Sequence, residues 1–255
     1  MRVIVFGATG SVGRLAVESL LADGHEVTAF ARRPDALEIS HYGLSRLAGD
    51  ALVLEEVCDA VAEQDAVVVT LSSGTSRTSV VRSRGTEHIV KAMQLHGVDR
   101  LICQSTLVAG DSWSNLNFFW KRIMFGLLLR PVFLDHERQE QLVRESGLDW
   151  TIVRPSAFTD APADGHYRVD IPAGERDLRL KISRADIADF LAGCLRDTRF
   201  MHRAVGLATD LAQIQEINNL LKSCRSCRDR RNCLARLLWL LGVWWTLNEP
   251  SCSGR

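Results

Sequence analysis

Three glycines follow the first apolar run of the chain and precede a run with helical spacing. Residues 2–6 lead into the stretch GATGSVG, whose glycines are Gly7, Gly10 and Gly13. Where a parallel strand turns into a helix, glycines permit the tight turn, a close approach to phosphate and close packing of the helix. The N–H groups of that helix start then point at the anion. The G-x-x-G-x-x-G spacing therefore predicts a nucleotide site, and a purely structural turn is the alternative.

The residues after the second apolar run indicate which nucleotide is bound. A dinucleotide fold that prefers NAD usually has an Asp or Glu here, which binds the ribose hydroxyls. This chain has Arg32 and Arg33 instead. A guanidinium fork suits a phosphate, so we predict NADP(H) in preference to NAD(H). A solvated basic loop is the alternative interpretation.

The elements that must position these residues alternate between short apolar runs and longer amphipathic stretches. Strands are predicted at 3–6, 26–30, 44–47, 66–71, 100–104 and 150–153, and helices at 12–22, 53–62, 80–96, 136–145 and 183–196. This order predicts an α/β protein: a Rossmann-type doubly wound parallel sheet with helices on both faces and a small C-terminal substrate lobe. Gly24, Gly97 and Gly147 stand where left-handed helix caps are expected, and Ser183 stands at an N-cap. Residues 157–165 are predicted to form a loop.

Composition limits the classes of partner and compartment. The chain has 255 residues, and its 31 Lys plus Arg balance 31 Asp plus Glu, so no net field attracts nucleic acid or a membrane. No apolar run reaches the about 18 residues of a transmembrane helix, and the first run is too short for a signal peptide. Cys58, Cys103 and Cys194 are isolated, which is typical of thiols in a reducing compartment. We therefore expect a cytoplasmic protein, monomeric or homodimeric, without a membrane span or a nucleic-acid partner.

The end of the chain differs in composition from the rest. From residue 223 onward it holds four of the seven cysteines and three of the six tryptophans. We therefore predict a nucleotide-binding domain over 1–222 and an extension over 223–255 outside its core. Cys224 and Cys227 form a single C-x-x-C, a weak zinc signal, and no metal site is predicted. The apolar run 234–247 is too short to span a bilayer, and lying on a membrane surface is a minor alternative.

Several stretches together resemble a known family. GATGSVG, the Gly49-Asp50 pair, RGTEHIVKAMQLHGVDRLI, SGLDWTIVRPSAF and SRADIADFL are similar to the atypical short-chain dehydrogenases/reductases, from residue 1 to about 209. The NmrA-like NAD(P)-binding branch and the flavin reductase/biliverdin-IXβ reductase group are the most similar members. The resemblance implies that the pyrophosphate is held by Gly7, Thr9, Gly10, Ser11, Val12 and Gly13, the 2′-phosphate by Arg32 and Arg33, and the adenine by Asp50 and Ala51. It also implies that Leu71, Ser72, Ser73 and Gly74 follow the ribose and pyrophosphate, that Ser105 and Thr106 face the nicotinamide, and that Pro155, Ser156, Ala157 and Phe158 wrap it.

The chain departs from the wider superfamily in its catalytic pair. The reductases there use Tyr-x-x-x-Lys, in which the lysine lowers the pKa of the phenol that protonates a carbonyl. Neither Tyr42 nor Tyr167 precedes a lysine at that spacing, and Lys121 has Asn117 at the tyrosine position. A carbonyl-reducing mechanism of the ordinary type is therefore not expected, and neither is an epimerase or dehydratase acting on a nucleotide sugar.

The remaining polar residues at the nicotinamide end suit a different acceptor. A flavin, a quinone or another conjugated molecule can take a hydride from the cofactor and a proton from solvent. Ser105 and Thr106 offer hydroxyl donors, and His136 would orient the acceptor or shuttle a proton, unless it is a solvated helix-start residue. The aromatic segment 111–133 would form a wall for a flat aromatic acceptor, a dimer contact or a buried helix. We predict an NAD(P)H-dependent reductase, with a non-catalytic NADP(H) sensor of the NmrA type as the alternative.

Overall fold

The computed structural model describes residues 1–72, 80–107, 130–171, 178–179 and 181–210. Met1–Thr209 form one compact unit. Ser73 and Gly74, most of the aromatic segment 111–133, the proposed boundary near residue 222 and the extension 223–255 lie outside the described residues. These predictions therefore stay predictions.

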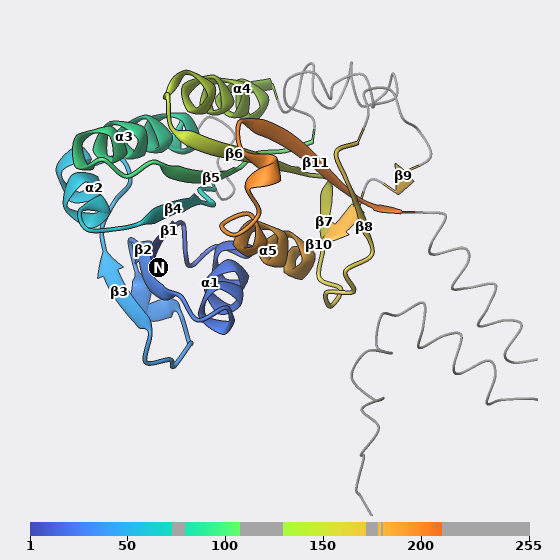
Figure 1. Cartoon of the computed structure of the whole chain (residues 1–255), viewed down its shortest axis with the longest axis horizontal. Coiled ribbons are helices and arrows are strands. Elements are labelled where there is room, and N and C mark those ends of the chain that lie inside the picture. Colours follow the sequence, from blue (N-terminus) through green and yellow to red (C-terminus); the bar gives the residue numbers. More distant parts are fainter. Residues whose placement is uncertain (73–79, 108–129, 172–177, 180, 211–255) are drawn as a thin grey trace, which may run out of the picture. The chain divides into compact units, whose positions relative to one another are not determined.

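A largely parallel sheet forms the centre of this unit (Figure 1). The strands run in the order β3-β2-β1-β4-β5-β6-β11-β8, and the short β9 also pairs with β11. Every pair from β3 to β11 is parallel, whereas β8 runs antiparallel to β11. Their bounds are β1 Arg2–Phe6, β2 Glu26–Ala31, β3 Leu44–Ala48, β4 Ala66–Val69, β5 Arg100–Gln104, β6 Asp149–Pro155, β8 Tyr167–Val169, β9 Leu178–Arg179 and β11 Arg203–Asp210. The order reverses beside β1, as in a doubly wound fold, so the predicted fold class is confirmed.

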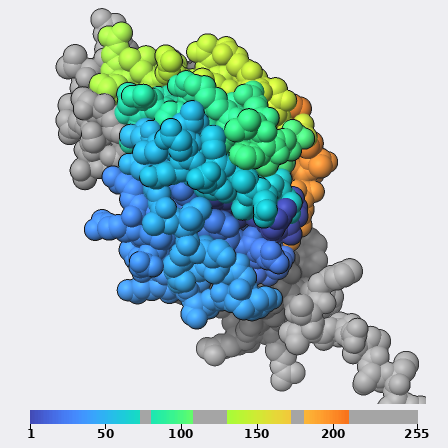
Figure 2. Space-filling model, turned by 90° about the vertical axis from the view of Figure 1, so that its left-hand side faces the viewer, coloured from blue at the N-terminus to red at the C-terminus, as the bar shows by residue number. Residues whose placement is uncertain are grey.

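Helices cover both faces of the sheet (Figure 1). On one face α1 (Gly13–Ala22) contacts α5 (Arg184–Gly193). On the other face α2 (Leu54–Val61), α3 (Val81–His96) and α4 (Arg130–Glu145) pack side by side, and they form neighbouring cyan, green and yellow-green bands in Figure 2. Two short 3-10 turns, Pro34–Ala36 and Thr198–Phe200, complete the described elements.

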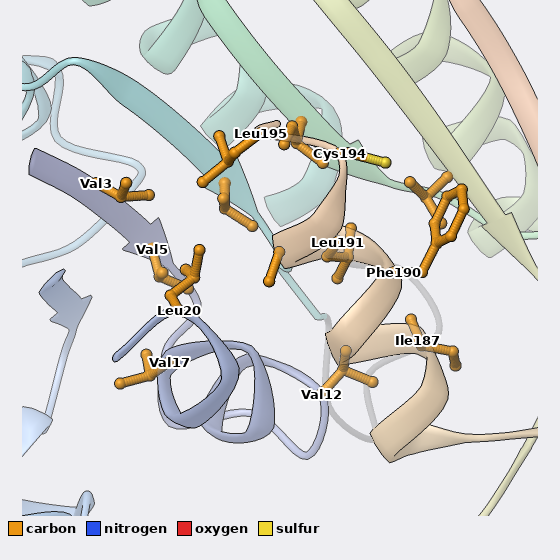
Figure 3. Close-up of a cluster of buried hydrophobic side chains, with 14 of the residues drawn as sticks. Val3, Val5, Val12, Val17, Leu20, Ile187, Phe190, Leu191, Cys194 and Leu195 are labelled. Carbon is orange, nitrogen blue, oxygen red and sulfur yellow. The ribbon is translucent and has the colours of Figure 1, made fainter. Parts of the chain in front are cut away.

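Alternation along the strands divides the core into two clusters. Successive side chains of a strand point to opposite faces, so Val3 and Val5 join the α1–α5 cluster while Ile4 and Phe6 join the other. Figure 3 shows Val3, Val5 and Leu20 of the first cluster to the left of α5. Because both faces are buried, β1 is a continuous apolar run, as a parallel strand inside a doubly wound sheet must be.

The predicted helix ends are confirmed. Gly24, Gly97 and Gly147 have φ values of 79°, 68° and 72°, in the left-handed region that glycine adopts without a steric penalty. Ser183 caps α5, because its Oγ accepts a hydrogen bond of 2.9 Å from the Asp186 N–H. Cys103 and Cys194 are buried free thiols, and Cys58 is half-buried.

Several predicted elements or boundaries are wrong, among them strand β6, which runs to Pro155 and not to residue 153, and helix α5, which ends at Gly193 and not at residue 196. Residues 157–159 form a strand, β7 (Ala157–Thr159), which pairs in parallel with β10 (Lys181–Ser183) beside the main sheet. Helix α4 begins at Arg130, with Pro131 in its first turn where a missing N–H is tolerated. Its start was missed because residues 131–134 are all apolar and show no helical period. Strand β4 ends at Val69, two residues before the predicted end.

Candidate active site

The glycine loop between β1 and α1 needs the absence of side chains at two of its three glycines. Gly7 has φ +83°, and a Cβ there would lie 2.7 Å from the Thr70 carbonyl oxygen. A Cβ on Gly13 would lie 2.2 Å from the Gly7 carbonyl oxygen, so only glycine lets α1 begin this close to the strand. Gly10 has more room, since its nearest contact would be 3.1 Å. Gly10 also lines the cavity described below, where the lack of a side chain suits a close approach by a phosphate.

Thr70 fixes the loop from the neighbouring strand. Its N–H and its Oγ1 both donate to the Phe6 carbonyl oxygen, at 2.9 and 3.0 Å. Sequence analysis missed this residue, because the bond joins positions 64 residues apart. The only signal that could have found it is its place just after a buried strand.

A cavity of about 210 Å³ opens at the carboxyl ends of the central strands. It gathers residues from the glycine loop, from the ends of β4 and β5, from α3 and α4, and from β7. They are Gly10, Ser11, Val12, Thr70, Leu71, Ser72, Arg82, Gln104, Ser105, Thr106, His136 and Phe158. Open parallel sheets offer their ligand crevices at this edge. Thr70, Arg82 and Gln104 are the members that sequence analysis did not single out.

Other predicted cofactor residues lie around this cavity without lining it. Arg32 and Arg33 are exposed after β2, and neither guanidinium pairs with another described residue. Asp50 forms a turn in which its Oδ1 accepts a 3.0 Å bond from the Leu52 N–H. Ala51 is buried beside α3. Gly85 makes this close packing possible, because a Cβ there would lie 2.6 Å from Leu71 Cδ1.

The remaining predicted residues come from the glycine loop and from the end of β6. Thr9 is exposed, while Gly7 and Gly13 shape the loop from behind. Pro155 ends β6 and is buried. The Ser156 N–H bonds the Leu207 carbonyl oxygen at 2.9 Å, and exposed Ala157 leads into Phe158.

Several buried polar atoms at the β5 end of the cavity have no hydrogen-bond partner among the described residues. The Ser105 N–H donates to the Val153 carbonyl oxygen at 2.7 Å, but the Ser105 Oγ is unpartnered, as is Gln104 Oε1. An unsatisfied buried polar atom costs about 1–3 kcal/mol. A ligand that donates and accepts here would recover that cost.

His136 lines the cavity from α4 and brings a neutral ring to it. Its Nδ1 is buried without a hydrogen-bond partner among the described residues. Burial, assisted by the positive charge of Arg82, lowers the pKa of His136 to about 4. The imidazole is therefore neutral at pH 7 and can donate or accept a hydrogen bond, but it holds no extra proton to give away.

A buried ion pair stands beside His136. The Arg82 guanidinium lies 3.7 Å from Asp135 Oδ2, and the two side chains are 12% and 2% exposed. Ser83 holds the carboxylate, because its N–H and Oγ both donate to Asp135 Oδ1, at 3.0 and 2.5 Å. Burial lowers the pKa of Arg82. This pair links the start of α3 to α4 at the cavity wall.

Neither tyrosine stands in this cavity. Tyr42 is 98% exposed. Tyr167 packs edge-on against Phe190, with ring centroids 6.0 Å apart, and burial raises its pKa to about 12. The described site therefore contains no phenol that could protonate an acceptor in the manner of the wider superfamily.

Comparison with known families supplies the decisive match. The sequence model of a family described as NAD(P)H-binding matches residues 7–198, which include the glycine loop and most of the described sheet. The chain belongs to the NAD(P)H-binding family. This membership confirms the resemblance to atypical short-chain dehydrogenases/reductases. It also shows that this chain is an NAD(P)H-binding protein of an oxidoreductase family.

One relative in sequence and two solved structures are also similar to this chain. The uncharacterized sugar epimerase YhfK of Bacillus subtilis is 27% identical over 230 residues, which cover 85% of this chain and 98% of that protein. The anaerobilin reductase ChuY of Escherichia coli O157:H7 superposes with a TM-score of 0.67 at 23% identity, over 81% of this chain and 96% of its own. A short-chain dehydrogenase/reductase of Veillonella parvula, solved with NADP, gives a TM-score of 0.64 at 22% identity, over 81% and 93%. At these identities the two structures show the fold alone.

The described ranges also bear on membranes and metals. Each helix within them falls short of the length and apolarity that crossing a bilayer requires. In the same ranges, no three His, Cys, Asp or Glu side chains gather in a group that could hold a metal ion.

Proposed function

We propose that this member of the family is an NADPH-dependent reductase of a flat conjugated acceptor, such as a flavin or a quinone. One observation carries the proposal. A single cavity joins the glycine loop, at Gly10 and Ser11, to the unpartnered Ser105 hydroxyl, neutral His136 and the half-exposed ring of Phe158. Cofactor and acceptor would therefore meet in one space, as hydride transfer requires.

The residues present fit a dinucleotide phosphate. The glycine loop would hold the pyrophosphate, Asp50 and Ala51 would meet the adenine, and Arg32 and Arg33 would bind the 2′-phosphate. Support for the last assignment is that both arginines are exposed and that neither guanidinium is engaged by another described residue. NADPH, when bound, supplies the hydride.

The protein's own groups would then position the acceptor. The Ser105 O–H and the Thr106 hydroxyl would donate to an acceptor oxygen or nitrogen, and neutral His136 would orient it. Because His136 has a pKa of about 4, the proton that completes the reduction would come from solvent at neutral pH. Phe158, 40% exposed at the cavity, offers a ring face on which a flat acceptor can stack.

The test follows the loss of NADPH absorbance with FMN and with a naphthoquinone as acceptors. We expect steady oxidation by the full chain, and a fall of about 100-fold in kcat when Ser105→Ala and Thr106→Val are combined, with NADPH affinity retained. Ser45→Ala, an exposed serine on β3, is the matched control and should leave the rate unchanged. Saturable NADPH binding without oxidation by any acceptor would refute the reductase.

The cofactor preference has its own test. Replacing both Arg32 and Arg33 with alanine should raise the KM for NADPH about 10- to 100-fold and leave the KM for NADH nearly unchanged, because each guanidinium–phosphate bond is charge-assisted. Arg46→Ala, an exposed arginine on the neighbouring strand β3, is the control. An equal loss for both cofactors would contradict the 2′-phosphate assignment.

A second candidate is an NADP(H) sensor without chemistry of its own. It is favoured by the absence of a tyrosine from the cavity, which also argues against a sugar epimerase. The sensor predicts tight, saturable NADPH binding and no turnover, whereas the reductase predicts both binding and turnover. The absorbance assay for NADPH oxidation and a fluorescence titration of NADPH binding therefore separate the two functions.

A further inference from the structure

We propose that the acceptor carries a negatively charged substituent, such as a carboxylate, and that Arg82 binds it at the cavity wall. This inference rests on the proposed reductase function and narrows its substrate class. Arg82 has no part in the cofactor assignments above. It is the second residue of α3 and lines the same cavity as Ser72, Gln104 and Ser105.

The charge of the cavity wall carries the argument. Among the described residues that line it, Arg82 is the only Lys or Arg, and none is an Asp or Glu. His136 adds no charge at pH 7, because burial holds its pKa at about 4. Among these described residues an anion therefore meets one guanidinium, while the carboxylate paired with it, Asp135, does not line the cavity. With its side chain 12% exposed, Arg82 presents that charge where water screens it weakly.

A second pair in the same region shows what a purely structural arginine looks like. Arg154 on β6 makes two close bonds to Glu140 on α4, Nε to Oε1 at 2.9 Å and an N–H to Oε2 at 2.7 Å. Both of these residues are almost fully buried, and neither lines the cavity. Arg82 differs from Arg154 in two respects. Its guanidinium stands 3.7 Å from Asp135, and Arg82 lines the cavity.

Asp135 supplies the negative charge that stabilises the buried Arg82 guanidinium. The carboxylate is fixed by two hydrogen bonds from Ser83, and it does not line the cavity itself. It therefore offsets the cost of burying the guanidinium from behind, while the cavity side of Arg82 stays turned toward the ligand. A planar guanidinium fork is suited to a carboxylate, to which it can donate two parallel bonds.

The test uses the full chain and two naphthoquinones that differ only in a carboxylate and its methyl ester. For the unmodified protein we expect a kcat/KM at least about 10-fold higher with the acid, since a charged hydrogen bond is involved. Arg82→Met should lower kcat/KM for the acid about 10- to 100-fold, mainly through KM, and change that for the ester less than about 3-fold. Arg84→Met, an exposed arginine on the same turn of α3, should change neither.

Calorimetric binding of the same two quinones to the complex with NADP⁺ gives a readout without turnover. The acid should bind more tightly than the ester, and Arg82→Met should abolish the difference. Equal binding of acid and ester by the unmodified protein would overturn the inference, even if both are reduced. A loss of NADPH affinity in Arg82→Met would also overturn it, by placing Arg82 on the cofactor. Failure to oxidise NADPH with any acceptor would instead refute the reductase, which the calorimetry does not depend on.

Discussion

The two helix layers that cover the sheet are held in different ways. Between α1 and α5 the contacts are apolar, from Val17 and Leu20 on one helix to Ile187 and Leu191 on the other (Figure 3). The polar contact described between them, Ser19 to Asp189 at 2.6 Å, lies at an exposed edge.

Between α3 and α4 polar contacts are buried as well, beside an apolar cluster that includes Ile89, Met93 and Val143. Ser83 donates to Asp135, and Gln139 donates to Thr86 at 3.1 Å, with all four side chains buried.

This difference separates stability from orientation. Apolar contacts are favourable but non-directional, so the contacts between α1 and α5 stabilise the sheet and the start of α1 at the glycine loop without orienting a polar side chain. Hydrogen bonds and ion pairs are directional, and buried ones cost stability if any member is missing. Arg82 and His136 both come from the polar layer. We infer that the polar contacts of this layer hold the orientation of these two side chains at the cavity.

The sharpest way to break the comparison is to remove a charge without changing shape. Glu140→Gln leaves Arg154 buried without its counter-charge, and we expect the free energy of unfolding to fall by about 3–5 kcal/mol. Urea denaturation measures it. The other partner of Glu140 is Arg144, and the Arg144 side chain is 40% exposed. Arg144→Met should therefore lower the free energy of unfolding by less than about 1 kcal/mol. Similar losses for the two variants would contradict the distinction between buried and exposed partners.

The polar layer should also make stability depend on pH through His136. In the unfolded chain this histidine binds a proton below about pH 6.5, but in the folded protein only below about pH 4, so between these values the unfolded state holds more protons. Stability should therefore fall as the pH falls through this window, by about 1–2 kcal/mol between pH 7 and 5. Arg82 and Asp135 face the same ring and act in opposite directions, the arginine lowering and the carboxylate raising its pKa.

Urea midpoints at pH 7 and 5 test this dependence. His136→Gln should reduce the difference between the two midpoints, and His96→Gln, an exposed histidine at the end of α3, should leave it as it is. An unchanged dependence in His136→Gln would show that other groups carry it.

A shape-conserving change in the apolar layer should be tolerated. Leu191→Met keeps nearly the same volume at a fully buried position of α5, so we expect a loss below about 1.5 kcal/mol. NADPH affinity and the acid-to-ester ratio should be unchanged, because α5 supplies no residue of the cavity. Urea denaturation and cofactor titration measure the two properties. A change in the acid-to-ester ratio would mean that the apolar layer also orients the site.

The smallest expected effect comes from exposed ion pairs, where the two layers should not differ. Glu18→Gln removes the partner of Arg14 on α1, and Glu87→Gln removes the partner of Lys91 on α3. Each should cost about 0.5 kcal/mol or less, since both pairs are solvated i,i+4 pairs. Urea midpoints at low and high salt measure the effect. A larger cost on α3 than on α1 would show that the polar character of that layer extends to its surface.

Much of the fold could be predicted because its signals are local. The glycine loop, the left-handed caps at Gly24, Gly97 and Gly147, and the Ser183 cap each depend on a few neighbouring residues. The doubly wound parallel sheet followed from the β-α alternation, which leaves few topologies. Strand β7 escaped prediction because its partner β10 lies about two dozen residues further along, and no pattern within 157–165 reveals it.

The site divides in the same way. The sequence by itself determined the glycine loop, because Gly7 and Gly13 are required by backbone sterics that any strand–helix turn of this kind imposes. Only the tertiary structure decided that Thr70 bonds a residue 64 positions away, and that Ser83 and Asp135, 52 positions apart, place an ion pair at the cavity. Side chains so far apart in the chain meet only through packing of whole helices and strands. The sequence therefore gives the chemical character of these side chains, whereas the fold decides which of them form hydrogen bonds and ion pairs.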